Sequence, residues 1–545
     1  MDILKHLEEK DSRSKSVNKF IKHMDLYLVG GVMLLTLIFA LVYVLRSKIV
    51  YFWDNSTYWD IGRMLAQKPL NFDMLKEVYV SIGTSDYNYF LAFPVALWMK
   101  IFGITRISYI LAIIVMYVVP TEILIFLMCK KISKAHRFAY VITVLIIPAL
   151  TYLAVIGFID VACVFWGLLC YYLYFTDVLS NHKCIKSVII GILLVFVMIS
   201  RRYFAFFAVS FLTVIAIDAI LFKRDIKHLI ITVVTTVAVL LICFYPFFTN
   251  ILLKDYGTLY AGYKYSFGTD MKLITRYFGL IFLLFLVVAV IYSAVKNKNL
   301  NAVLALLQAV VCAVMFISTQ THGQQHLLLY IPSLVYLVII CINSINKIWM
   351  LLLVVFIAIS NTVSPAIKRV QPQNIQEIKH IALFPKYSVT PPKREDINDI
   401  IALKRALDNK IPEGKTCGVL SSSFVLNSSI LINAMPSLNL SDERTDNYIV
   451  GLPEVDSRDY WRLNEIYNCD YILVAYPAQI HLPQNEQTIV TEAVSSFANN
   501  TDVSNAFECI NDFAGKVGDI DVKLYKRIRN VHETEKTEYK LKLYK

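Results

Sequence analysis

Residues 51–65, which read YFWDNSTYWDIGRML, follow the first long apolar run and combine acidic with aromatic side chains. A carboxylate placed where membrane meets water is costly to keep unless it takes part in binding or chemistry. Asp54 is therefore the first candidate for a residue that takes part in chemistry. A purely structural alternative is that Asp54 caps the helix that follows it.

Guanidinium groups appear at a second unusual place. Arg201, Arg202 and Tyr203 interrupt a nearly continuous apolar stretch. A planar guanidinium pairs well with phosphate oxygens, so these arginines are candidates for binding a phosphate group, with lipid headgroups as the alternative occupant. Asp160 opens another apolar run and could simply pair with one of the two arginines.

Two further loops carry polar side chains. His322 and His326 lie four residues apart, a spacing that suits metal binding on a helix, and Gln325 lies between them. Histidines with satisfied hydrogen bonds at the membrane surface are the alternative. Lys264 belongs to the tyrosine-rich loop 249–276, which is typical of an aromatic belt but would also suit stacking against a sugar.

The composition is that of a membrane protein. Hydrophobic residues make up 57% of the chain and charged residues 17%, and the mean hydropathy is +0.56. A soluble globular protein has about 45–50% apolar and about 25% charged residues. The formal net charge of +12 falls in short basic clusters between apolar runs, as in cytoplasmic loops, so no nucleic acid is expected as a partner.

Apolar stretches of about 20 residues predict about eleven membrane-spanning helices. They lie near 26–45, 107–128, 138–156, 160–176, 187–200, 203–222, 228–248, 277–295, 302–319, 327–343 and 347–364. Basic clusters occupy alternate loops and place the N-terminus in the cytoplasm. We therefore expect a multi-pass protein of the cell membrane, in contact with membrane lipids, whose C-terminal part is extracytoplasmic.

The predicted order is a cytoplasmic segment 1–25, a transmembrane domain 26–364, a linker 365–395 and an extracytoplasmic α/β domain 396–545. In the first outer loop, 46–106, the stretches 57–68 and 88–102 are too short to cross and predict helices lying on the membrane. Asn55 or Ser56 is the expected cap of the first of these helices. The α/β pattern rests on a helix at 396–408 and strands at 416–421, 470–475 and 521–525.

These motifs resemble the GT-C superfamily of polytopic glycosyltransferases, in the branch of the protein mannosyltransferases and the lipid A aminoarabinose transferase. That branch has an Asp-Glu pair, a Tyr and a small-Arg-x-hydrophobic tail after its first span. Here Asp54, Tyr58 and Arg63 match, and Asn55 replaces the second acid.

Weaker matches follow in the same order over about the first 220 residues. They are the segment from Asn88 to Phe102 with Gly103 and Arg106 after it, Asp160 at the start of a span, and the basic end of the stretch 191–201. The Lys/His-Pro-Pro sequence that usually precedes the interfacial helix is reduced here to Tyr87-Asn88.

The resemblance implies a mostly α GT-C-like fold and an enzyme that transfers a hexosyl or pentosyl group from a polyprenyl-phosphate sugar, with inversion, to a surface polysaccharide, teichoic acid, lipid or protein. Asp54 would be the general base. Asp160 would orient the acceptor or hold a divalent cation, Mg²⁺ or Mn²⁺, with His322 or His326. The expected substrate-binding residues are Tyr58, Arg63, Asn88, Arg201, Arg202, Tyr203, Lys264, His322, Gln325 and His326.

Two other functions are alternatives. A transporter or flippase would place its polar residues near the bilayer midplane and often shows inverted repeats, whereas the polar residues here gather at one face and no repeat is evident. A polymerase of lipid-linked glycans would use the same arginines but would transfer whole chains.

Overall fold

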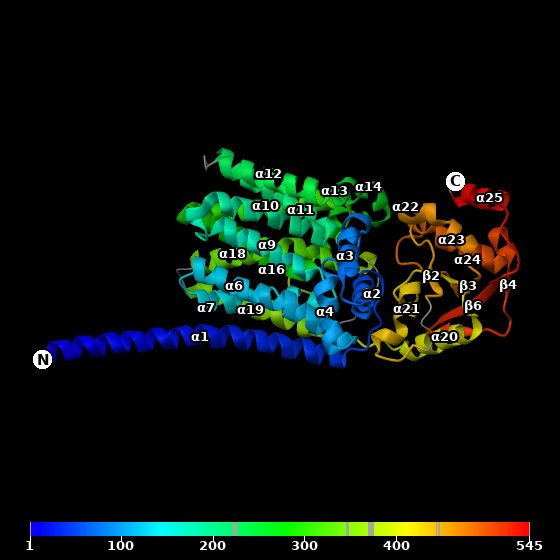
Figure 1. Ribbon diagram of the computed structural model, residues 1–545, viewed down its shortest axis with the longest axis horizontal. Coiled ribbons are helices and arrows are strands. Elements are labelled where there is room, and N and C mark those ends of the chain that lie inside the picture. Colours follow the sequence, from blue (N-terminus) through cyan, green and yellow to red (C-terminus); the bar gives the residue numbers. More distant parts are fainter. Residues whose placement is uncertain are drawn as a thin grey trace.

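The computed structural model describes residues 2–221, 226–344, 348–368, 375–442, 444 and 447–543. Long helices form a bundle, and a smaller part with a β-sheet lies at one end of it (Figure 1). The N-terminus lies towards the other end of the bundle. Residues 369–374 of the predicted linker fall outside the described residues.

Apolar helices build the bundle. They are α1 (Asp2–Arg46), α5 (Arg106–Ile113), α6 (Val119–Ile132), α7 (His136–Ile146), α8 (Ala149–Val155), α9 (Val161–Phe175), α10 (Lys183–Ser200), α11 (Ala205–Leu221), α12 (Ile226–Cys243), α16 (Leu280–Asn297), α17 (Leu300–Thr319), α18 (Ile331–Ser344) and α19 (Ile348–Ala366). A π-helical turn over Ile114–Val118 joins α5 to α6.

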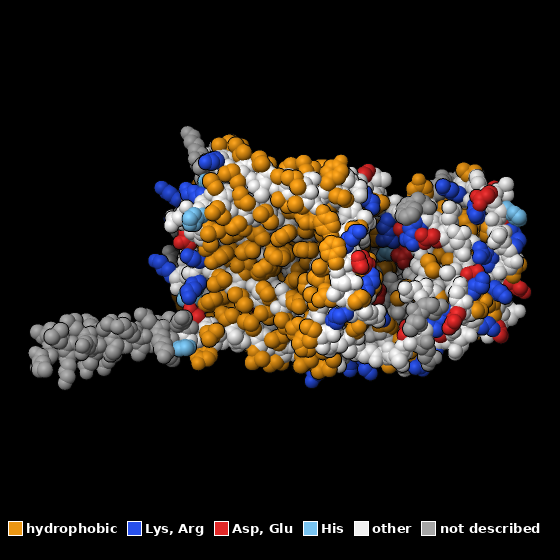
Figure 2. Space-filling model, viewed as in Figure 1, with side chains coloured by type: hydrophobic (Ala, Val, Ile, Leu, Met, Phe, Trp, Pro, Cys, Tyr) orange, Lys and Arg blue, Asp and Glu red, His pale blue; other side chains and the backbone are white. Residues whose placement is uncertain are grey.

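Seven described helical segments are long and apolar enough to cross a membrane, and the number rises to nine if each of two bent helix pairs is one span. Shorter apolar helices over Val161–Phe175 and Met350–Ala366 coincide with the two remaining predicted spans. The protein is a polytopic membrane protein. Figure 2 shows a broad apolar surface on this face of the bundle, with Lys and Arg side chains gathered at the end away from the sheet.

Shorter helices lie between the bundle and the C-terminal part. They are α2 (Trp53–Gln67), α3 (Phe72–Thr84), α4 (Ala92–Phe102), α13 (Tyr245–Phe247), α14 (Tyr256–Leu259) and α15 (Phe267–Phe278). The predicted cap of α2 is wrong, because the helix begins earlier, after Phe52, and has no side-chain cap. Helix α3 was not predicted, although Asn71 caps it through the backbone N–H of Met74.

A sharp bend brings α15 to this end of the bundle. The axes of α15 and α16 differ by 89°. The bend is made at Gly279, whose φ of +80° suits glycine. A Cβ at that position would lie 3.0 Å from the backbone oxygen of Leu383.

The C-terminal part is an α/β domain with a mixed sheet in the order β2-β1-β3-β6-β4, and β5 pairs with β6. Its strands are β1 (Cys417–Leu420), β2 (Ile449–Gly451), β3 (Tyr471–Tyr476), β4 (Phe507–Cys509), β5 (Gly515–Val517) and β6 (Ile520–Arg527). Its main helices are α20 (Ile397–Lys410), α21 (Ser428–Ser437), α22 (Asp456–Asp459), α23 (Asn464–Asn468), α24 (Thr488–Asn499) and α25 (Glu533–Leu543). Strand β1 is parallel to β2 and β3, whereas β3 is antiparallel to β6.

Both faces of this sheet are covered, which explains why β1 is buried at every position. Leu473 packs into one apolar cluster, with Ile400 and Leu407 of α20. Its neighbour Ile472 points to the opposite face and packs into a second cluster, with Val490 of α24. The result is a three-layer domain that supports the loops facing the bundle.

A candidate active site between the bundle and the C-terminal domain

A cavity of about 880 Å³ lies between the helical part and the C-terminal domain. Its lining includes seven of the predicted site residues: Asp54, Arg201, Arg202, Tyr203, His322, Gln325 and His326. Side chains of the C-terminal domain line it as well, among them Glu454, Arg458 and His481. Charged side chains gather where the two parts meet in Figure 2. The predicted residues thus face a shared space, and the C-terminal domain closes it.

Asp54 lies in the first turn of α2 and is held by three neighbours. The Tyr87 hydroxyl donates a hydrogen bond to its Oδ1, and the Gln325 amide donates to its Oδ2 over 2.8 Å. The Arg201 guanidinium lies 3.6 Å from Oδ2. Because each carboxylate oxygen accepts two hydrogen bonds, Asp54 keeps capacity for a further donor. Its side chain is 29% exposed, so the carboxylate is fixed in place and still open to the cavity.

Arg201 is almost fully enclosed, with 5% of its side chain exposed. Its Nε is paired with Asp160, and its Nη1 donates to the Tyr58 hydroxyl over 3.1 Å. The guanidinium also lies over the rings of Tyr58, Tyr87 and Tyr203, at 5.1, 4.7 and 5.3 Å from their centroids. Arg201 therefore links Asp54 to Asp160 across the membrane-side wall of the cavity.

Arg202 belongs to a separate charged group. Its Nη1 lies 2.6 Å from the Asp86 carboxylate, which is also 3.3 Å from Lys254. The rings of Tyr256 and Tyr260 lie 4.7 and 5.3 Å from the guanidinium. Burial raises the pKa of Asp86, but the charges of Arg202 and Lys254 outweigh burial and hold that pKa below its ordinary value. Two cations against one carboxylate leave this group with a surplus positive charge.

The predicted histidines are hydrogen-bonded. The His322 Nδ1 lies 2.6 Å from Asp270, and its Nε2 lies 2.5 Å from the Tyr330 hydroxyl. The backbone N–H of Gly323 donates to His326 Nδ1 over 2.8 Å. Among the described residues, no three His, Cys, Asp or Glu side chains form a group that could hold a metal ion. Asp160 pairs with Arg201 and does not lie with either histidine in such a group, so no step of the reaction is assigned to a cation.

Four predicted binding residues lie outside the lining of the cavity. Arg63 pairs with Asp60 over 3.5 Å, because the two residues are one helical turn apart on α2. Asn88 donates to the backbone oxygen of Ile199 over 2.7 Å and fixes the end of α10. Lys264 is exposed and donates to the backbone oxygen of Ser318 over 2.7 Å. Tyr58 and Asp160 also lie behind the surface of the cavity, in contact with Arg201.

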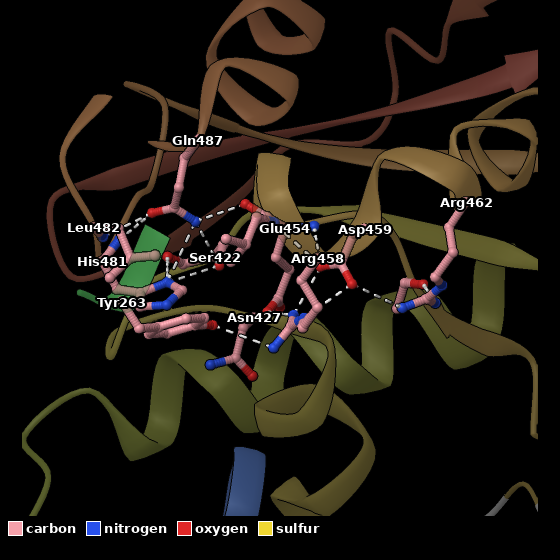
Figure 3. Close-up of polar contacts among 12 residues, drawn as sticks. Tyr263, Ser422, Asn427, Glu454, Arg458, Asp459, Arg462, His481, Leu482 and Gln487 are labelled. Carbon is pink, nitrogen blue, oxygen red and sulfur yellow. Dashed lines mark hydrogen bonds and ion pairs between the residues drawn. The ribbon is translucent and has the colours of Figure 1, made fainter. Parts of the chain in front are cut away.

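The sequence did not identify the wall that the C-terminal domain contributes. There Arg458 donates to both carboxylate oxygens of Asp459, at 2.9 and 2.7 Å, and to the Tyr263 hydroxyl at 3.2 Å (Figure 3). Glu454 lies 3.5 Å from Arg458. The stretch 454–462, EVDSRDYWR, combines charged and aromatic residues, and it is the sequence signal that could have identified this wall.

Trp53 connects the two walls. It has a φ of +47°, in the left-handed region that bulky residues rarely adopt. Its indole packs against Phe424 and His481 of the C-terminal domain, with ring centroids 5.0 and 4.4 Å away. Burial lowers the pKa of His481 to about 4, so this ring is neutral at physiological pH. The C-terminal domain thereby holds the residue that precedes Asp54.

No protein-family model and no curated protein matches the sequence. Among solved structures, ArnT from Cupriavidus metallidurans bound to undecaprenyl phosphate matches with a TM-score of 0.56. The match covers 92% of this chain and 97% of ArnT, at 11% sequence identity. The chain has the ArnT fold. The apo state of ArnT gives a TM-score of 0.57 at 10% identity over the same shares. The resemblance to the GT-C branch is confirmed at the level of the fold.

Proposed function

We propose that this protein is a membrane glycosyltransferase that uses a polyprenyl-phosphate sugar as donor. The observation that carries the proposal is the position of Asp54, a partly exposed carboxylate in the lining of the cavity, held by Tyr87, Gln325 and Arg201. The shared fold supports the donor class, because one of the matching ArnT structures is bound to undecaprenyl phosphate.

The reaction that suits this arrangement is a direct displacement at the anomeric carbon. A hydroxyl of the acceptor forms the new C–O bond while the bond from that carbon to the phosphate oxygen breaks. The proton of the hydroxyl passes to Asp54, and the phosphate leaves as an anion. Opposite faces of the carbon are used by the two oxygens, so the configuration is inverted.

The two arginines have different roles in this reaction. Arg201 is already paired with Asp160 and faces Asp54, so it orients the base. Arg202 belongs to the group with the surplus positive charge, and Lys254 adds to it. That group is the better site for the phosphate of the donor, since fixed cations stabilise the charge that develops on a leaving phosphate.

The cavity lies on the outer face in this proposal, with the C-terminal domain extracytoplasmic. The basic end of the bundle away from the sheet supports that orientation (Figure 2). A cysteine placed at residue 450 should react with an impermeant reagent in intact cells. Transporter or flippase activity is the competing function, but the charged groups line a cavity at one end of the bundle rather than its midplane.

Substitution of the base is the direct test. We expect Asp54→Asn to lower the transfer rate about 10²- to 10⁴-fold, because the amide cannot accept the acceptor's proton. The rate would be measured with polyprenyl-phosphate sugars extracted after metabolic labelling, and cell envelopes from a strain lacking this chain would serve as acceptor. Binding of undecaprenyl phosphate should persist in the variant.

Asp73→Asn is the matched control. Asp73 is an exposed carboxylate on α3 in the same loop and does not line the cavity, so its loss should leave the rate within about twofold. Full transfer by the Asp54→Asn variant would remove the mechanism. Movement of intact labelled lipid across the membrane without transfer would favour the flippase.

A further inference from the structure

The wall contributed by the C-terminal domain has no role in the chemistry described so far. It reaches the cavity through Glu454, Arg458, Arg462 and His481, all of which line it. These residues come from the loop before α22, from α22 and the 3₁₀ turn that follows it, and from the loop after β3 (Figure 3). The question is which substrate touches this wall.

The geometry of the reaction indicates which substrate contacts the wall of the C-terminal domain. A polyprenyl tail must stay in the bilayer, so the phosphate of the donor lies on the membrane side of its sugar. In an inverting displacement the attacking oxygen approaches opposite the leaving oxygen. The acceptor must therefore enter from the side away from the membrane, where the C-terminal domain forms the wall. This step rests on the proposed function.

We propose that this wall is the acceptor subsite, that it binds an uncharged, hydroxyl-rich carbohydrate, and that Glu454 accepts hydrogen bonds from its hydroxyl groups. Trp53, Tyr263 and His481 supply ring surfaces beside this carboxylate, and all three line the cavity. The centroids of the Trp53 and His481 rings are 4.4 Å apart, and those of Tyr263 and His481 are 6.1 Å apart. Flat rings next to a hydrogen-bonding carboxylate match a sugar, which has apolar faces and polar edges.

Glu454 is fixed by its backbone and retains a usable carboxylate. Its N–H donates to Asp459 over 3.0 Å, and its C=O accepts from the Gln487 amide over 2.8 Å (Figure 3). Arg458 gives its two short hydrogen bonds to Asp459 and lies 3.5 Å from Glu454. Burial raises the pKa of Glu454, and the neighbouring Arg458 and Trp53 oppose the rise. A carboxylate that burial has partly removed from water is stabilised by hydrogen bonds from the hydroxyl groups of a ligand.

The charge of the wall favours a neutral ligand over a polyanionic one. Asp459 neutralises Arg458, and Glu465 neutralises Arg462 over 2.6 Å. These two arginines face three carboxylates, those of Glu454, Asp459 and Glu465, so the group carries a surplus negative charge. A phosphate-rich polymer would meet repulsion here, whereas the surplus positive charge of the membrane-side wall lies with Arg202 and Lys254.

The test distinguishes binding of the acceptor from binding of the donor. We expect Glu454→Gln to raise the half-saturating amount of envelope acceptor about tenfold or more, since a charged acceptor of hydrogen bonds is lost. Glu454→Ala should raise it further. Neither change should alter the KM for the polyprenyl-phosphate sugars or the affinity for undecaprenyl phosphate by more than about twofold, because the donor lies on the other wall.

Glu413→Gln is the control, since Glu413 is an exposed carboxylate of the same domain that does not line the cavity. It should leave the acceptor dependence unchanged. An unchanged acceptor dependence in Glu454→Ala, or a donor affinity that falls in parallel, would overturn the acceptor subsite and leave the proposed function standing. A wild-type protein that transfers nothing to the envelopes would overturn both. Transfer that improves with phosphate-rich envelope polymers, compared with phosphate-free ones, would contradict the neutral ligand.

Discussion

The two walls of the cavity contain the same kind of unit, an arginine paired with an aspartate beside tyrosine, at different depths. Arg201 and Asp160 are 5% and 1% exposed in the bundle. Arg458 is 31% exposed in the C-terminal domain, although its partner Asp459 is 4% exposed. Both arginines line the cavity, but the membrane-side unit is packed almost completely, whereas Arg458 is partly exposed.

The partners that remain after loss of each arginine also differ. Asp160 would keep the Tyr203 hydroxyl at 2.9 Å, and its Oδ2 is buried with no hydrogen-bond partner in the described structure. Asp459 would keep the backbone N–H groups of Glu454 and Val455, at 3.0 and 3.1 Å. The stability of the first wall therefore depends more strongly on its arginine than the stability of the second wall does. This difference suits a fixed catalytic wall and a wall adapted to its ligand.

The largest expected effect tests that contrast. Arg201→Met should lower the free energy of unfolding by about 3–5 kcal/mol, because it leaves a buried carboxylate without its cation. Arg458→Met should lower it by about 1.5–3 kcal/mol, the scale of charged hydrogen bonds. Chemical denaturation of the detergent-solubilised protein measures both values.

The double variant Arg201→Met with Asp160→Asn sharpens the result. Removing both charges should recover much of the stability lost in Arg201→Met, since the unpaired carboxylate is then absent. Equal losses of unfolding free energy in Arg201→Met and Arg458→Met would show that burial of the arginine does not determine how strongly each wall depends on it.

Much of the membrane-side wall could be predicted from the sequence. Apolar runs mark the spans directly, and the loops between them indicate where Asp54, Arg201 and Arg202 emerge. All three line the cavity. Arg63, Asn88 and Lys264 do not line the cavity, because the sequence indicates the element that carries a residue and not the direction of its side chain.

The other wall could not be predicted, for a physical reason. Glu454 and His481 reach the cavity through tertiary contacts although they lie 400 and 427 residues after Asp54, and no local pattern encodes such pairing. Tyr87 lies next to Asn88, but in the sequence it indicates only a departure from a family motif and not its contact with Asp54. The left-handed φ of Trp53 depends on Phe424 and His481, which only the folded domain brings to it.

The packing of Trp53 against Phe424 and His481 links the two walls, and its loss should give the next largest effect on stability. Replacing Trp53 by Gly or by Ala removes the same packing, but only Gly adopts a φ of +47° without strain. We expect Trp53→Gly to be more stable than Trp53→Ala by about 1–2 kcal/mol. At an unstrained position Ala would be the more stable by about 0.4–1 kcal/mol, so the sign alone decides. Thermal unfolding of the two variants measures it.

A smaller and pH-dependent effect is expected where α2 meets α21. The Asn433 amide donates to Asp60 over 3.1 Å, and Asn433 Oδ1 is buried with no hydrogen-bond partner in the described structure. Burial raises the pKa of Asp60 to about 6, against the opposing effects of Asn433 and Arg63. A protonated Asp60 could donate to the unpaired Oδ1, which adds to the preference for the neutral form.

Because the folded protein holds this proton more tightly than the unfolded chain, Asp60 favours folding at low pH. That contribution should be lost as the pH rises from about 4 to about 6. The side chain is 39% exposed, so solvent screening should keep the effect below about 1 kcal/mol. Asp60→Asn should remove it, and the difference in unfolding free energy between wild type and variant, followed from pH 4 to 8, measures it. A difference that grows in favour of the wild type as the pH rises would mean that Asp60 is ionised at this contact and that its pairing with Arg63 dominates.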